Sequence, residues 1–149
     1  MDCLDSGQDG EFRTGKAWPE PRFELQGDDL ALDRLTGLVC PCIASVGDFP
    51  MSWTEALDAV KLMNEENAFG HADWRLPSRR ELSSLISYSH HRPAMPAGHP
   101  FTDIREAYWS STSSAYSPDW AYCLYLHKGA VGVGFKAKRE FHAWLVAIE

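Results

Sequence analysis

The chain has 149 residues and a formal net charge of −7, from 14 Lys and Arg against 21 Asp and Glu. Hydrophobic residues make up 44% and charged residues 23%, a composition typical of a soluble globular protein with a single domain. The negative charge argues against a nucleic-acid partner, because neutralising phosphates requires a basic surface. The charge is uneven: residues 1–70 carry 5 basic and 14 acidic groups (net −9), and residues 71–149 carry 9 and 7 (net +2).

The N-terminal residues 1–21 are rich in Gly, Asp, Glu and Pro and predict an irregular arm, followed by one domain over residues 22–149. Their start, "MDCLDSGQDGEF", has neither the basic beginning nor the apolar stretch of a signal peptide. Either the protein is cytoplasmic or a leader is absent from this sequence. No apolar run is long enough for a transmembrane helix, so we expect no membrane insertion.

Residues 22–37 predict a β-hairpin, in which Phe23 and Leu25 precede a turn at residues 27–29 and Leu30 and Leu32 follow it. "DRLTG" then predicts a second turn that ends on Gly37.

Two helices are predicted in the middle of the chain. Ser52 with Glu55, and Ser78 with Glu81, have the spacing of a capping box, in which each Ser begins a helix. The apolar residues after each cap recur at helical spacing: Trp53, Ala56, Leu57, Val60 and Met63 in the first helix, Leu82, Leu85 and Ile86 in the second. A long loop follows from His90 to Ile104, and long loops in compact domains are often functional.

The last third predicts strands. "AYWSSTSS" is a short strand, and a hairpin turns at residues 127–129, with Trp120, Tyr122, Leu124 and Leu126 on one face and Val131, Val133 and Phe135 returning. "FHAWLVAIE" predicts an apolar, central strand. Strands, two grouped helices, a loop and further strands indicate an α+β fold.

The sequence contains no established catalytic or metal-binding pattern. The six His lack ligand spacing, the Ser-rich strand lacks a nucleophile elbow, and the acidic residues lack an EF-hand order. We therefore expect no enzymatic activity, no cofactor and no metal. The cysteines Cys3, Cys40, Cys42 and Cys123 form no CxxC pair, although a bridge from Cys3 to Cys40 or Cys42 could form in an oxidising compartment.

Several aromatic residues are candidates for an exposed binding face, because aromatic planes beside hydrogen-bonding groups suit glycans or protein surfaces. They are Trp109, Tyr116, Trp120, Tyr122 and Tyr125. A basic cluster, "KAKR", follows them.

The ordered motifs "DRLTGL", "SWTEAL", "ADWRLPSRRELSSLISYS", "PAMPAGHPF" and "YWSSTS" resemble the Lcl C-terminal domain family, with similarity from about Gly7 to Val146. "DWRLPS" followed by "EL" is also similar to a corner of formylglycine-generating-enzyme-like proteins. Both resemblances imply a C-type-lectin-like fold, an α+β domain in which two helices flank twisted antiparallel sheets with a long loop region. This chain has Cys40 where the family usually has Trp, and Trp144 near the position of a C-terminal Cys in many members.

The resemblance implies a non-enzymatic binding or adhesion module in the bacterial cell envelope or secreted space, with a glycan, including sulfated or acidic ones, or a protein as ligand. The alternatives are a structural or assembly domain of a larger envelope protein, as an oligomerising tip that forms a homo-oligomer or as a tandem unit, and, less favoured, an enzyme of the formylglycine-generating type. The expected ligand-binding residues are Tyr116, Asp119, Trp120, Tyr122, Tyr125, Lys128, Lys136, Lys138 and Arg139.

The segment around "DWRLPS" is expected to be a structural corner rather than a ligand loop. Asp73 and Arg75 are expected to pair across the turn, with Trp74 and Leu76 in the core. The corner motif comprises Asp73, Trp74, Arg75, Leu76, Pro77, Ser78 and Glu81.

Overall fold

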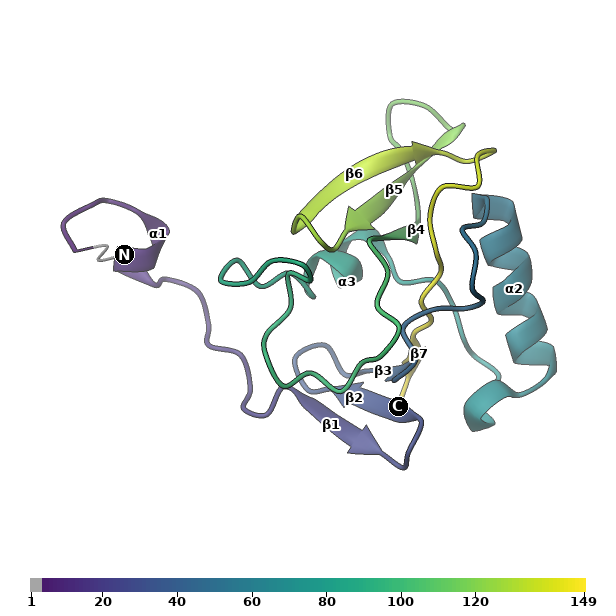
Figure 1. Cartoon of the computed structure of the whole chain (residues 1–149), viewed down its shortest axis with the longest axis horizontal. Helices are drawn as coiled ribbons and strands as arrows, with labels where there is room; N and C mark the ends of the chain where they lie inside the picture. Colours follow the sequence, from purple (N-terminus) through teal and green to yellow (C-terminus); the bar gives the residue numbers. More distant parts are fainter. Residues whose placement is uncertain (1–3) are drawn as a thin grey trace.

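The computed structural model describes residues 4–149 and shows an α+β fold with two antiparallel sheets (Figure 1). The first sheet has the order β1-β2-β3-β7 and the second the order β4-β5-β6. The elements in chain order are α1 (Asp9–Phe12), β1 (Phe23–Gln26), β2 (Leu30–Asp33), β3 (Leu38–Pro41), α2 (Trp53–Glu65), a 3₁₀ turn (Ala68–Gly70), α3 (Arg79–Ser83), β4 (Ala107–Ser113), β5 (Trp120–Tyr125), β6 (Ala130–Phe135) and β7 (Ala147–Ile148).

The first sheet confirms the predicted hairpin. Strand β1 pairs antiparallel with β2, so that Phe23 lies opposite Asp33 and Leu25 opposite Ala31. The second predicted turn ends at Gly37, whose φ of 74° is in the left-handed region that glycine adopts most readily. There the Asp33 carbonyl accepts the backbone N–H of Gly37 at 2.7 Å.

The N-terminal arm differs from the prediction by one turn of helix, α1, none of whose residues is buried. In Figure 1 the arm extends away from the two sheets. The buried Arg22 attaches its end to the domain: its guanidinium donates to both carboxylate oxygens of Asp33, at 2.9 and 2.7 Å, and to the Ser84 carbonyl at 2.8 Å. Cys3 lies outside the described residues, so its expected bridge stays a prediction.

Both predicted capping boxes are confirmed. Ser52 and Ser78 each accept the backbone N–H of the Glu three residues later, and each Glu side chain accepts the backbone N–H of its Ser. Helix α2 buries Ala56 and Val60 against the core.

Helix α3 is shorter than its apolar pattern suggested, because Leu85 and Ile86 lie beyond its end. The hydroxyls of Ser83 and Ser84 donate to backbone carbonyls of the helix, at 2.9 and 2.6 Å. Such side-chain bonds compete with the helical ladder. Ile86 still reaches the core, but from a turn.

The second sheet divides its side chains between two core clusters. The faces alternate as predicted: Trp109, Ala121 and Cys123 join the cluster beside α2, and Tyr108 and Leu124 join the cluster beside α3. Strand β4 shifts register between Trp109 and Ser113.

The C-terminal segment 141–147 separates the two clusters. Phe141, Ala143 and Leu145 belong to the cluster with α2, whereas Trp144 and Val146 belong to the cluster with α3. Both sides of the segment are therefore buried, as in a central strand.

The prediction of a central strand is nevertheless wrong. Only Ala147 and Ile148 form a strand, and β7 lies at the edge of the first sheet. The preceding residues bond to successive, unrelated partners: the Phe141 carbonyl accepts from Met51, the Ala143 carbonyl from Val46, and Val146 exchanges two bonds with Arg75. The apolar composition predicted correctly that the segment is buried on both sides, but it cannot identify hydrogen-bond partners.

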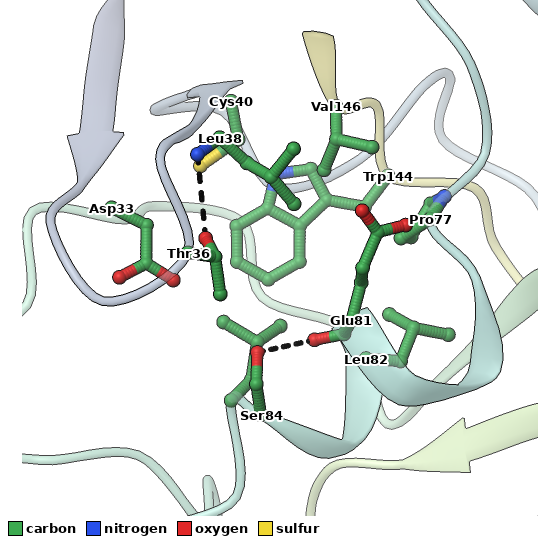
Figure 2. Close-up of a pocket in the computed structure, with 11 residues that line it drawn as sticks. Asp33, Thr36, Leu38, Cys40, Pro77, Glu81, Leu82, Ser84, Trp144 and Val146 are labelled. Atoms are coloured by element: carbon green, nitrogen blue, oxygen red, sulfur yellow. Dashed lines mark hydrogen bonds between the residues drawn. The ribbon is translucent and has the colours of Figure 1, made fainter. Parts of the chain in front are cut away.

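Cys40 and Trp144 lie close together in the core. Both belong to the cluster beside α3 and line one small cavity (Figure 2). The indole Nε1–H of Trp144 donates to the Pro41 carbonyl at 3.2 Å. The large ring and the thiol thus pack within a single cluster.

Candidate functional site

The "DWRLPS" corner has a structural role. Trp74 and Leu76 are buried, as expected. The expected pair of Asp73 with Arg75 is wrong: Arg75 forms a two-pronged ion pair with Glu81, at 2.6 and 2.7 Å. Asp73 instead lies 3.4 Å from the ring of His71. The Glu81 carboxylate also accepts the Ser78 backbone N–H in the capping box, which places it beside Arg75. One carboxylate therefore both caps α3 and fixes the corner.

The nine residues expected to bind a ligand do not form one face. Strand β5 runs from Trp120 to Tyr125, five positions along the chain. Because a strand rises about 3.3 Å per residue, the two ends of the β5–β6 hairpin are roughly 17 Å apart. Tyr125 and Lys128 lie at the turn end, with Lys128 Nζ 5.5 Å from the Tyr125 ring centre. The others lie at or toward the opposite end, in the β4–β5 loop, β5 and the segment after β6: Tyr116, Asp119, Trp120, Tyr122, Lys136, Lys138 and Arg139.

An aromatic strip runs along the face of the second sheet that is turned toward α3, at that opposite end. We define it as Trp120, Tyr122, Val133 and Phe135, whose side chains face the same way because Trp120 pairs with Phe135 and Tyr122 with Val133. The Trp120 and Phe135 ring centres are 5.5 Å apart, and Trp120 and Val133 are 40% and 43% exposed. The Arg79 guanidinium of α3 lies 4.2 Å over the Tyr122 ring.

Two of the aromatic candidates outside the strip differ in their exposure to solvent. Tyr116, in the loop just before β5, is 96% exposed. The expectation that Trp109 is exposed is wrong: it is fully buried, and its indole N–H donates to the Met51 carbonyl at 2.8 Å.

The basic cluster after β6 is largely engaged within the chain. Lys136 donates to the Ser113 hydroxyl at 2.7 Å and lies 4.1 Å over the Trp53 ring. Arg139 pairs with Glu55, at the start of α2, and Lys138 lies 3.7 Å from Glu140. These cations attach the end of the hairpin to neighbouring elements, so their charge is partly neutralised before any ligand arrives.

A cleft of about 400 Å³, which the sequence did not predict, lies at the turn end of the hairpin. We call it the polar cleft. Its polar wall consists of Arg105, Glu106, His127, Glu140 and His142, and the rings of Tyr125 and Phe141 form its apolar wall. These residues come from three separate segments, so no local motif marks them.

The polar cleft contains two unpaired atoms. Within the described part of the chain, Arg105 Nε and His142 Nε2 are shielded from solvent and have no hydrogen-bond partner. The terminal nitrogen of Arg105 contacts Asp103 at 2.9 Å. Burial, and secondarily the charge of Arg105, lowers the pKa of His142 below its usual value, so the ring is neutral at pH 7.

The cavity in Figure 2 is of a different kind. It lies between α3 and the β2–β3 turn, and its volume of about 30 Å³ holds roughly one water molecule. Around it, Ser84 donates to the Glu81 carbonyl and the Leu38 backbone N–H donates to the Thr36 hydroxyl. The cavity is a packing gap rather than a ligand site.

The cysteines of the described chain are buried thiols. Cys40, Cys42 and Cys123 are free, and burial raises the pKa of each, to about 11 for Cys123. Among residues 4–149, no three His, Cys, Asp or Glu side chains gather as metal ligands. No helix in this range is long and apolar enough to cross a membrane.

The comparisons with known proteins identify a family. A scan of protein families matches residues 29–147 to the Lcl C-terminal domain. A search of curated proteins gives no match. The matched range includes the corner, both helices α2 and α3, the aromatic strip and the polar cleft. The chain belongs to the Lcl C-terminal domain family.

Proposed function

We propose that this domain is a non-enzymatic binding module that recognises a glycan through the aromatic strip. One observation carries the proposal: half-exposed aromatic rings lie beside a cation on a face built from β5, β6 and α3. The Trp120 side chain is 40% exposed, and the Arg79 guanidinium lies over the Tyr122 ring. Sugar rings stack on such planes, while a guanidinium donates to hydroxyl, carboxylate or sulfate oxygens.

The fold and the location belong to the same proposal. We infer a C-type-lectin-like fold. It is supported by two antiparallel sheets, by α2 and α3, which lie between β3 and β4 along the chain, and by the long segment that joins α3 to β4. The family resemblance supports a site of action in the bacterial cell envelope or secreted space. The buried Cys123, with its raised pKa, is unsuited to nucleophilic attack, which supports a non-enzymatic role.

A glycan array of neutral, carboxylated and sulfated sugars tests the function. We expect binding that persists in EDTA and that Trp120→Ala weakens roughly tenfold. Tyr88→Ala is the matched control, because Tyr88 is 92% exposed and lies outside the strip. The absence of binding to every glycan, or equal losses in both variants, would contradict the proposal.

Strand β6 supports the alternative of an assembly domain. It lies at the edge of the second sheet, and residues 130–135 contain no charge and no proline that would protect such an edge. Edge-to-edge pairing with another chain would bury the half-exposed Val133. Sedimentation velocity separates the two roles: a dimer that Val133→Lys returns to monomer favours assembly, and a monomer at high concentration favours ligand binding.

A further inference from the structure

The polar cleft is distant from the aromatic strip along the hairpin and has its own chemistry. The strip lies beside α3, whereas the cleft opens between the segment 104–107, the hairpin turn and the segment 140–142. A ligand in the cleft would contact none of the four residues of the strip.

The unpaired atoms in the cleft complement a hydroxyl group. Arg105 Nε–H is a donor, and burial of a donor without a partner is unfavourable. His142 Nε2 also has no partner, and in a neutral ring protonated at Nδ1 it is a lone-pair acceptor. A hydroxyl accepts one hydrogen bond and donates another, so sugar hydroxyls complement both kinds of atom. Because both atoms are shielded, a small displacement of one side chain must accompany binding.

The charge around the cleft indicates a neutral ligand rather than an anion. Arg105 already pairs with Asp103 and lies 3.9 Å from Asp48. Glu106, 85% exposed at its side chain, lies 3.6 Å from the His127 ring, and Glu140 stands at the rim. A sulfate or carboxylate would meet these carboxylates, whereas sugar hydroxyls can donate to them.

The apolar wall fits the other side of a sugar ring. The Tyr125 and Phe141 rings are 5.6 Å apart and perpendicular, at 89°. Phe141 is 5% exposed and supports the Tyr125 ring from behind, so the partly exposed Tyr125 ring is the surface that can meet the C–H groups of a pyranose. The cleft volume of about 400 Å³ is within the range of small-ligand sites.

We propose that the polar cleft binds a neutral saccharide, whose hydroxyls pair with Arg105 Nε–H and His142 Nε2. The inference rests on the proposal that the domain binds glycans, but it assigns a second site and a different ligand charge. The carboxylates of Glu106 and Glu140 accept further hydroxyls, and the Tyr125 ring receives the apolar face.

Amide chemical shifts in the full chain test the proposal. The probes are methyl glycosides of glucose, galactose and mannose, with a sulfated heparin disaccharide for comparison. We expect at least one neutral glycoside to shift the amides of Glu106, His127 and Phe141 in a saturable way, and the sulfated probe to leave them unmoved. If no neutral glycoside shifts them, or if the shifts map only to the aromatic strip, the proposal is wrong.

Variants separate this site from the strip. Arg105→Lys keeps the charge but removes Nε–H, and should weaken neutral-sugar binding roughly tenfold. Glu140→Gln, at the rim, should weaken it severalfold even if the Arg105 variant folds poorly. Glu24→Gln, on the exposed strand β1, is the matched control and should change nothing.

Each outcome assigns the failure to one site. Unchanged affinity in both cleft variants would overturn the cleft proposal and leave the strip untouched. If Trp120→Ala has no effect while the cleft variants lose binding, the strip proposal fails and the cleft proposal stands.

Discussion

Gly134 provides a direct test of how tightly the second sheet packs against the C-terminal segment. A Cβ added to Gly134 would lie 2.2 Å from Phe141 Cε2 and 3.0 Å from Trp109 Cη2. Ordinary contact begins near 3.4 Å, so the Phe141 ring would have to move by more than about 1 Å. Phe141 is 5% exposed and Trp109 is fully buried, which leaves no space for the movement.

We expect Gly134→Ala to lower the free energy of unfolding by about 2–3 kcal/mol through overpacking. This corresponds to a decrease in Tm of roughly 4–8 °C or more for a domain of this size. Gly132→Ala should lose less, about 1 kcal/mol, because its clash is with the ring of the half-exposed Tyr125, which can turn toward solvent.

Urea unfolding followed by tryptophan fluorescence measures these differences, provided that the m-value is unchanged. Gly15→Ala is the matched control, because nothing lies within 4 Å of its added Cβ and its φ is not in the left-handed region. If Gly134→Ala unfolds within about 0.5 kcal/mol of Gly15→Ala, the packing described for β6 is wrong.

The corner and the cysteines lead to two further predictions. Arg75 lowers the pKa of Glu81 to about 2, so the stability from this carboxylate is present above pH 4.5 and is lost as the pH falls toward 2. Because solvent screens part of the ion pair, Glu81→Gln should lower the free energy of unfolding by about 1–2 kcal/mol at pH 7. Urea titrations should show a much smaller loss near pH 2.5. In a Cys3→Ser background at pH 8, iodoacetamide should label the three remaining thiols slowly in the native state and rapidly in urea, because burial raises the pKa of each; rapid native labelling of Cys123 on mass spectrometry would contradict its burial.

Local features of the fold were predictable from the sequence because their causes are local. The capping boxes at Ser52 and Ser78 depend on residues three apart, and both formed as expected. The hairpin turns depend on neighbouring residues in the same way. The sequence was insufficient where two side chains compete for one partner. Arg75 pairs with Glu81 rather than Asp73, because the capping box already holds the Glu81 carboxylate in place.

The candidate sites were predictable only in part, for the same reason. Alternation along β5 placed Trp120 and Tyr122 on one face, which is half of the aromatic strip. It could not show that Trp109 faces the core or that Arg139 is occupied by Glu55. The polar cleft combines three segments, and its unpaired atoms are defined by the absence of nearby partners, a property that only the folded chain has.

The position of segment 141–147 between the two clusters also has a kinetic consequence. Its contacts close very long loops: the hydrogen bond from Trp144 to Pro41 joins residues 103 positions apart. The entropy of closing such loops must be lost before the contacts stabilise anything, which slows folding toward the millisecond-to-second range of non-local topologies. Since neither cluster is complete until this segment is in place, the two clusters should form and dissolve together, and slow amide exchange in both should report the same global opening.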